Sequence, residues 1–396
     1  MKTIEDLAKA GRLGPRAPFV RCVTAILSPS LLRSPDVKQP GTFSLFRGLR
    51  ERASWLPACV TRCVDCVDDT VVDAAFLPRL DVHRRALRLQ PLQDGVYRDY
   101  FLCERSLLFV PEWFAPPQET WPRGLSQVGW PLEVDPGESP SGESPSGESP
   151  SGESPSPLPD DLARWLEDTE PKYGRTVAFL CGADNPPHAR DFFATAVAIV
   201  ARMNRSYRDR DLPSKFRVIV DETKRTRAVF LTEHPEVIPA EVADGTVEEK
   251  NIFHSASWTD LDALLPKCTA VVHGGGVGTV AAAVTHSTPQ LVCPSRFDQY
   301  DNARRVKQRG VGEVFSIKKI CEASRSKSVL KRVRDALWRL SDPWETNPYR
   351  KQYVKLKRVD KAERVGRKGL RFAAGEIVGM FDAMDPKPPP RLEFLS

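Results

Sequence analysis

The sequence predicts an α/β fold, with one complete doubly wound parallel sheet in its second half and a partial, mostly helical region before it. Three observations predict this. Short apolar runs alternate with amphipathic stretches from residue 176 to residue 309, as strands alternate with helices. A glycine-rich segment joins one such strand to the next helix. A tract almost free of apolar side chains separates the two regions, at residues 137–159.

The expected elements of the second half follow one another through short loops. Strands are predicted where apolar and β-branched residues run together between Gly, Pro or polar residues, and helices where apolar residues recur at helical spacing. The expected strands are 176–181, 216–220, 251–254, 269–273 and 289–293. The expected helices are 189–203, 259–265, 279–286, 298–309, 329–340 and 366–381.

The first part of the chain has a weaker pattern. Residues 43–66, interrupted by Pro57, and residues 82–89 are predicted to be helical. Short strands are expected at 107–110 and 127–131, but no run of alternating strands and helices is visible before Asp99. We therefore expect a partial region at 1–136, a linker at 137–159, and a complete domain at 160–386 that includes the C-terminal helices.

The expected linker is a tandem repeat. Four copies of Gly-Glu-Ser-Pro-Ser occupy residues 137–156, followed by Pro157 and Pro159. Such a tract cannot bury enough apolar surface to offset the entropy lost on ordering. We expect it to be a disordered spacer between the two regions.

Composition excludes several classes of protein. The chain has 396 residues, 41% of them hydrophobic, and a net charge of +6. Acidic and basic residues are interleaved, which argues against a nucleic-acid partner. No apolar leader or run long enough to span a membrane is visible, so a cytoplasmic protein with reduced cysteines is expected. Peripheral contact with an anionic membrane is a minority alternative for basic clusters such as residues 304–307.

Three cysteines form a C-x3-C-x2-C pattern, namely Cys59, Cys63 and Cys66. Some enzymes hold an iron–sulfur cluster with three thiolates at this spacing. We favour a helix instead, because positions i, i+4 and i+7 share one face, on which cysteine behaves as a small buried hydrophobic residue. No metal and no cofactor are therefore expected.

The glycine-rich segment favours phosphate binding. Glycines let the backbone approach an anion and point N–H groups at it, and a helix N-terminus adds partial positive charge. His273, at the end of the strand, is expected to donate to a phosphate oxygen, and Thr279 to cap the helix. The segment fits neither the dinucleotide fingerprint nor the Walker loop. A plain strand-to-helix turn is the structural alternative.

Several linked motifs carry a family resemblance. Residues 257–279, 289–294 and 297–303 resemble, in order, the donor-site region of UDP-dependent glycosyltransferases of the GT-B type (glycosyltransferase family 1). The nearest branches are the sterol 3-beta-glucosyltransferase-like and the antibiotic-modifying enzymes. The resemblance implies that 160–386 is a nucleotide-sugar-binding Rossmann-like domain and that 1–136 lies on the acceptor side.

The resemblance also implies residue roles. Trp258 would lie beside the uracil base, and Gly182 would face the diphosphate. Asp298 and Gln299 would bind sugar hydroxyls, which both donate and accept hydrogen bonds. The whole expected site is Gly182, Trp258, His273, Gly274, Gly275, Gly276, Val277, Gly278, Thr279, Asp298 and Gln299. Structural alternatives are a core position for Trp258 and a helix N-cap for Asp298.

The sequence departs from the family at several points. Gly274 stands where the sterol-type branch has a second histidine, Ala281 where the plant-type branch has a glutamate, and Ala183 where a serine or threonine is common. Only residues 109–131 resemble the acceptor domain, and only its end. The units that supply the catalytic base are not visible, and His83 is a poor candidate. The catalytic residues are therefore unassigned, and the chain resembles a truncated or divergent enzyme.

We expect a glycosyltransferase that moves a hexose, such as glucose, from a UDP-sugar to a sterol, lipid or other small hydroxylated acceptor. One alternative is a non-catalytic or half-enzyme UDP-sugar-binding module that needs a partner chain for the acceptor site. A UDP-sugar epimerase is a weaker alternative.

Overall fold

A computed structural model gives the fold. The structure describes residues 23–27, 29, 32, 58–92, 95–96, 105–118, 121, 125–130, 158–167, 173–181, 186–208, 225–232, 234–237, 251–255, 259–323, 325–342, 347–364 and 369–382. These residues belong to two compact units. The first comprises residues 1–138 and 360–396, and the second comprises residues 139–359.

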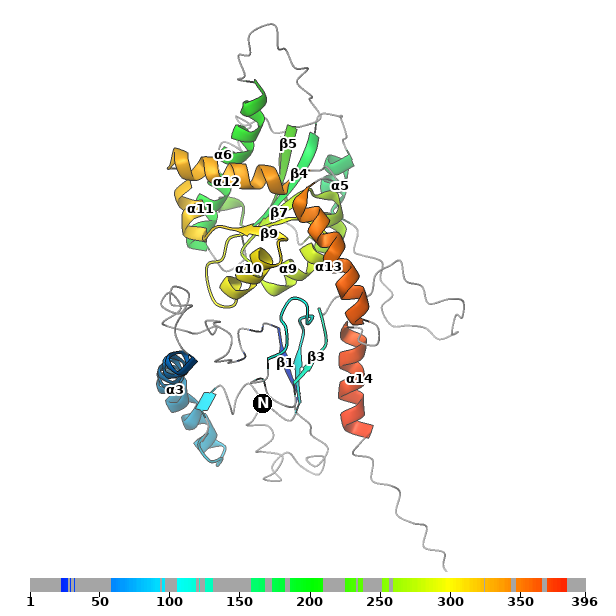
Figure 1. Cartoon of the computed structure of the whole chain (residues 1–396). Coiled ribbons are helices and arrows are strands. Elements are labelled where there is room, and N and C mark those ends of the chain that lie inside the picture. Colours follow the sequence, from blue (N-terminus) through cyan, green and yellow to red (C-terminus); the bar gives the residue numbers. More distant parts are fainter. Residues whose placement is uncertain are drawn as a thin grey trace, which may run out of the picture. The chain divides into compact units, whose positions relative to one another are not determined.

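The second unit contains a six-stranded sheet in which every pairing is parallel (Figure 1). The strands lie in the order β6-β5-β4-β7-β8-β9. The first three strands in sequence therefore run outward in one direction from β4, and the next three run outward in the other from β7. This is the doubly wound arrangement, so the predicted α/β class is confirmed. The strands are β4 (Tyr173–Leu180), β5 (Arg225–Leu231), β6 (Ile252–Ser255), β7 (Ala270–His273), β8 (Gln290–Val292) and β9 (Gly312–Val314).

Helices cover both faces of this sheet. Phe179 and Val272 point into a core shared with α6, α11 and α12, whereas Ala178 and Val271 point into a core shared with α5, α8 and α9. Neighbouring residues of a strand thus face opposite cores, which is why the central residues of β4 and β7 form continuous apolar runs. The helices are α5 (Asp160–Glu167), α6 (Pro186–Arg208), α8 (Leu261–Leu264), α9 (Val277–Thr285), α10 (Gln299–Gln308), α11 (Ile317–Ala323), α12 (Lys327–Leu340) and α13 (Pro348–Arg364), with short 3-10 turns at Pro235–Val237 and Leu265–Lys267.

Two strands of the second unit were not predicted. The expected strand at 216–220 lies outside the described residues, and the strand that pairs with β4 is β5, at Arg225–Leu231. Arg225 and Arg227 interrupt the apolar pattern of β5, so the sequence did not indicate a strand there. Arg227 is nevertheless buried, because its guanidinium donates to the Thr176 hydroxyl and to the carbonyls of Trp165 and Leu166. The three-residue β9 is too short to give a pattern.

The first unit contains a three-stranded parallel sheet in the order β1-β2-β3. Its strands are β1 (Val23–Ile26), β2 (Arg105–Leu108) and β3 (Leu125–Gln127). The strand expected at 107–110 overlaps β2, whereas the strand expected at 127–131 shares only Gln127 with β3. The description of this region as mostly helical missed β1. The long helix α3 (Ala58–Ala86) spans the region between the two stretches predicted to be helical, 43–66 and 82–89, and includes parts of both. Residues 43–57 of the first stretch lie outside the described residues.

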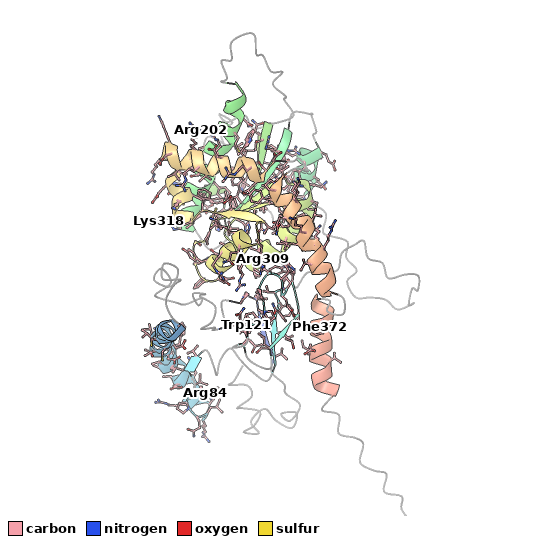
Figure 2. The ribbon with its side chains drawn as sticks, viewed as in Figure 1. Arg84, Trp121, Arg202, Arg309, Lys318 and Phe372 are labelled. Atoms are coloured by element: carbon pink, nitrogen blue, oxygen red, sulfur yellow. The ribbon has the colours of Figure 1, made fainter. Side chains whose placement is uncertain are left out.

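The last described helix, α14 (Gly369–Asp382), packs within the first unit. Ala373 is buried against Leu107, Phe109 and Val128, and Phe372, labelled in Figure 2, adds a partly buried ring. Glu376 accepts a hydrogen bond from the Ser126 hydroxyl over 3.1 Å. Because these contacts are apolar and long-range, the end of the chain groups with the first unit. The sequence-based range 160–386 had grouped this helix with the second domain.

The cysteine pattern of the first unit falls within α3, as the helical interpretation predicts. The expected burial is wrong for Cys63 and Cys66, which are both exposed. Among the residues that the structure describes, no three His, Cys, Asp or Glu side chains are grouped to hold a metal ion. Within the same residues, no helix is both long and apolar enough to cross a membrane. The Gly-Glu-Ser-Pro-Ser repeats lie outside the described residues, so their expected disorder stays a prediction.

Candidate functional site

The candidate site lies where the strand order of the second unit reverses. Leu180, His273 and Val292 are the last residues of β4, β7 and β8, and they are in register across the sheet. The loops that follow these strands therefore leave the same edge at the same level. In doubly wound sheets, ligands bind in the crevice at this edge, next to the point of reversal.

The loop after β7 depends on a glycine at position 275. Gly275 has φ of +92°, which residues with a side chain rarely adopt. A Cβ atom there would lie 2.7 Å from Val292 Cγ1 and 3.2 Å from the Gln299 carbonyl oxygen. Both conformation and space therefore require glycine. This positions the loop tightly against the end of β8.

The start of α9 is open in front of the loop. A Cβ added at Gly276 or Gly278 would meet nothing within 4 Å. The N-cap is Gly276, which makes no side-chain cap, so the expectation that Thr279 caps this helix is wrong. The N–H groups of residues 277–279 lie in the first turn, where the helix itself offers no acceptor. These donors and the partial positive charge of the helix end suit an anion such as a phosphate.

His273 does not point a free N–H into this crevice. Its Nδ1 accepts from the Gly275 N–H over 3.1 Å, and its Nε2 lies 3.0 Å from Gln290 Oε1. The ring is buried, and burial lowers the pKa of His273 to about 4. The imidazole is therefore neutral at pH 7. Both ring nitrogens of His273 bond within the protein in this structure, and the expected hydrogen bond from His273 to a phosphate stays a prediction.

Gln299 lies beside the glycine loop. Its Oε1 accepts from the Ser295 N–H at 2.9 Å and from the Ser295 hydroxyl at 3.0 Å. Its Nε2 lies 3.7 Å from the place of a Cβ at Gly274. The acceptor end of this amide therefore orders its own loop, while the donor end faces the loop after β7.

Asp298 is held beside the same loop by a residue that the sequence reasoning left out. Asn302 Nδ2 donates to Asp298 Oδ2 and to the Gly275 carbonyl, both over 3.0 Å. Burial raises the pKa of the Asp298 carboxyl, although the Asn302 bond opposes that shift. Asp298 occupies the N-cap position of α10 but makes no side-chain cap. The i, i+4 spacing of Asp298 and Asn302 on a predicted helix was the available signal.

Two of the expected site residues, Gly182 and Trp258, lie outside the described residues. Of the other nine, His273 is the last residue of β7, and the remaining eight lie in the loops after β7 and β8 or in the first turn of the following helix. His286, for which no site role was expected, pairs with Asp262 over 2.9 Å. The tertiary structure thus gathers segments 273–279 and 298–299 at one edge of the sheet.

These features define a class: a Rossmann-like α/β domain with an open helix N-terminus at its switch point. Comparison with known proteins shows which family the second unit resembles. Residues 237–342 match the family described as "Erythromycin biosynthesis protein CIII-like, C-terminal domain". The match takes in both loops of the candidate site.

Two curated relatives illustrate the similarity. The chain is 53% identical over 55 residues to the elloramycin glycosyltransferase ElmGT of Streptomyces olivaceus. It is 43% identical over 82 residues to the sterol 3-beta-glucosyltransferase UGT80A2 of Arabidopsis thaliana. The aligned parts cover 14% and 19% of this chain, and only 14% and 13% of the respective relatives. The sequence similarity to glycosyltransferases is thus strong but local.

A solved structure, the glycotransferase of kitacinnamycin, aligns with 78% of this chain and 62% of its own, at 17% identity and a TM-score of 0.49.

Proposed function

We propose that the second unit is the nucleotide-sugar donor domain of a GT-B-type glycosyltransferase. The observation that carries this proposal is the open first turn of α9, which faces the edge of the sheet beside the loop of Asp298 and Gln299. One motif offers donors for a diphosphate, and the other offers an acid and an amide for sugar hydroxyls. The local similarity to glycosyltransferases supports the same assignment.

The proposed chemistry is stabilisation of a departing nucleoside diphosphate. Transfer of the sugar breaks its bond to the β-phosphate oxygen, where negative charge grows. Fixed backbone N–H groups at a helix end stabilise such charge without reorganising. Thr279, in the first turn of α9, adds a hydroxyl donor in this proposal. Trp258 and Gly182 keep their proposed roles beside the base and the diphosphate.

The donor in this proposal is a UDP-hexose, with glucose as the sugar. The acceptor is a sterol, a lipid or another small hydroxylated molecule. The relative named for sterol glucosylation supports this choice, whereas the relative named for elloramycin supports an antibiotic-like acceptor. A thymidine diphosphate sugar has a pyrimidine base and a diphosphate, as a UDP-sugar does. The test below therefore compares binding of the two nucleotides.

Titration calorimetry of the full chain with UDP and with TDP tests the donor site. We expect saturable binding of at least one of the two. A Gly278→Asp substitution places a carboxylate in the open space before α9, so the affinity should fall at least about tenfold by charge repulsion. The melting temperature should not fall, because an acid suits a helix N-terminus. A Gly375→Asp substitution, on α14 and also with nothing near its Cβ, is the matched control. Absence of binding to both nucleotides would refute the donor site.

The second candidate function is a binding module that needs a partner chain for the acceptor site. His83 is the one histidine of residues 1–138 and 360–396, and it is exposed on α3. Transfer to a hydroxyl needs a base to take its proton, and an exposed histidine on a helix surface is poorly placed for that task. An assay of UDP-glucose and TDP-glucose consumption with mixed sterols and phenols separates the two functions. Nucleotide binding without turnover would favour the module.

Peripheral membrane attachment is a further expectation of the sequence. Co-sedimentation with vesicles of phosphatidylserine in phosphatidylcholine, at low and high salt, tests it. Retention only at low salt would support an electrostatic contact.

A further inference from the structure

A buried chain of hydrogen bonds links the glycine loop to helix α13. It begins with the Gly275 N–H, which donates to His273 Nδ1 over 3.1 Å. His273 Nε2 lies 3.0 Å from Gln290 Oε1, and Gln290 Nε2 donates to the Tyr353 hydroxyl over 2.9 Å. The Tyr353 hydroxyl in turn lies 2.9 Å from the Thr288 carbonyl and 3.1 Å from the Val311 carbonyl.

Both ends of this chain fix its direction. The Gly275 N–H can only donate, so His273 Nδ1 must be the acceptor and Nε2 must carry the proton. The carbonyls at the other end can only accept, so the Tyr353 hydroxyl must donate to them and accept from Gln290. Between these ends, Gln290 can satisfy both neighbours only with its oxygen toward His273. The polarity of every bond is thereby determined.

Burial makes these bonds consequential. His273 is 1% exposed, and Gln290 and Tyr353 are fully buried. Water cannot replace a lost partner at such positions, so a broken link leaves an unsatisfied polar group. Turning the Gln290 amide over would place two acceptors against each other at Tyr353 and two donors against each other at His273. The opposite His273 tautomer would place an Nδ1–H against the Gly275 N–H, which is again a pair of donors.

We propose that Gln290 and Tyr353 are positioning residues for the donor site, which act by setting the tautomer of His273. With Nδ1 unprotonated, His273 holds the Gly275 N–H and, with it, the left-handed turn of the loop. The diphosphate is then left to the N–H groups at the start of α9. This inference rests on the proposed function, because it assigns the loop a nucleotide ligand. Its first test does not need that ligand.

The first test measures the tautomer of His273 in the ligand-free full chain. The protein is labelled with ¹⁵N-histidine, and the His273 signals are assigned by their loss in His273→Asn. We expect an unprotonated Nδ1 and a protonated Nε2 near neutral pH. Tyr353→Phe and Gln290→Met each remove one link, so each should shift the two His273 nitrogen resonances toward a mixture of tautomers. Tyr349→Phe is the matched control on the same helix, because its hydroxyl bonds to Glu313 instead.

The second test measures affinity for UDP and TDP in the same variants. We expect Tyr353→Phe and Gln290→Met to weaken binding about tenfold, and Tyr349→Phe to leave it unchanged. An Nδ1-protonated His273 in the wild type would overturn the inference, as would His273 resonances that do not change in either variant. Unaltered nucleotide affinity in variants whose tautomer has changed would also overturn it. Absence of binding in the wild type would instead refute the proposed function. The tautomer measurement would then still show whether Gln290 and Tyr353 set the tautomer of His273.

Discussion

The side chain of Asn302 donates to the backbone carbonyl of Gly275 over 3.0 Å. The same nitrogen also donates to Asp298 Oδ2, so one buried amide joins the loop after β7 to the loop after β8. Neither loop can move along the sheet edge without breaking this link. The expected diphosphate-binding and sugar-binding segments are therefore joined by the side chain of Asn302.

Replacing Asn302 tests this link. We expect Asn302→Ala to lower the free energy of unfolding by about 2 kcal/mol, because it leaves the buried Gly275 carbonyl unsatisfied. Affinity for UDP or TDP should fall as well, since the two loops lose their common anchor. Asn204→Ala is the matched control: Asn204 bonds to the backbone of Thr226, away from the site. Chemical denaturation and calorimetry would contradict us if Asn204→Ala weakened nucleotide binding as much.

Gly275 and Gly278 should differ sharply in how well they tolerate substitution by alanine. Gly275→Ala forces a side chain into a positive φ and against Val292, so we expect a loss of about 2–4 kcal/mol of stability. Gly278→Ala adds a methyl group to open space within a helix, so the stability should be unchanged or slightly higher. Thermal and urea denaturation of both variants give the comparison. Equal stability of the two would show that the strained loop conformation is incorrect.

Acid should destabilise the protein through His273. Its pKa is lowered by burial to about 4, below the ordinary value of 6.5. The unfolded chain therefore binds a proton that the folded chain does not between these values. The stabilising contribution is complete above about pH 6.5 and is lost as the pH falls to about 4, up to about 3 kcal/mol in all. In His273→Asn, the dependence of the unfolding free energy on pH should be shallower over this window. Identical slopes in the two proteins would contradict the assignment.

Arg227 should contribute stability without affecting the site. Its guanidinium bonds to three acceptors and stacks 4.7 Å over the Trp165 ring, which ties α5 to the sheet. Lysine cannot reproduce the planar arrangement of donors, so Arg227→Lys should cost about 2–3 kcal/mol. Arg164→Lys, an exposed change on α5, should cost less than about 0.5 kcal/mol. Nucleotide affinity should match the wild type in both, and a marked loss in Arg227→Lys would contradict this separation.

Local patterns predicted much of the second unit. The segments that became β4, β7 and β8 contain short apolar runs, and the segment that became α10 is amphipathic, so their residues alone indicate their structure. β5 escaped prediction because Arg225 and Arg227 interrupt its apolar run, and only the acceptors that α5 and β4 supply make Arg227 a core residue. β1 was not predicted because four residues are too few to show a periodic pattern, and the strand is stabilised by its pairing with β2.

The sequence by itself determined the α/β class of the second half and the glycine-rich turn before α9, because both follow from short-range periodicity and from the conformational freedom of glycine. Tertiary structure alone decided that α14 packs with the first unit and that His273 is turned inward. Those outcomes depend on partners such as Leu107, Gln290 and Tyr353, which lie far away in the chain. A hydrogen bond or an apolar contact between distant residues leaves no periodic trace in the sequence, because each partner also suits many other folds.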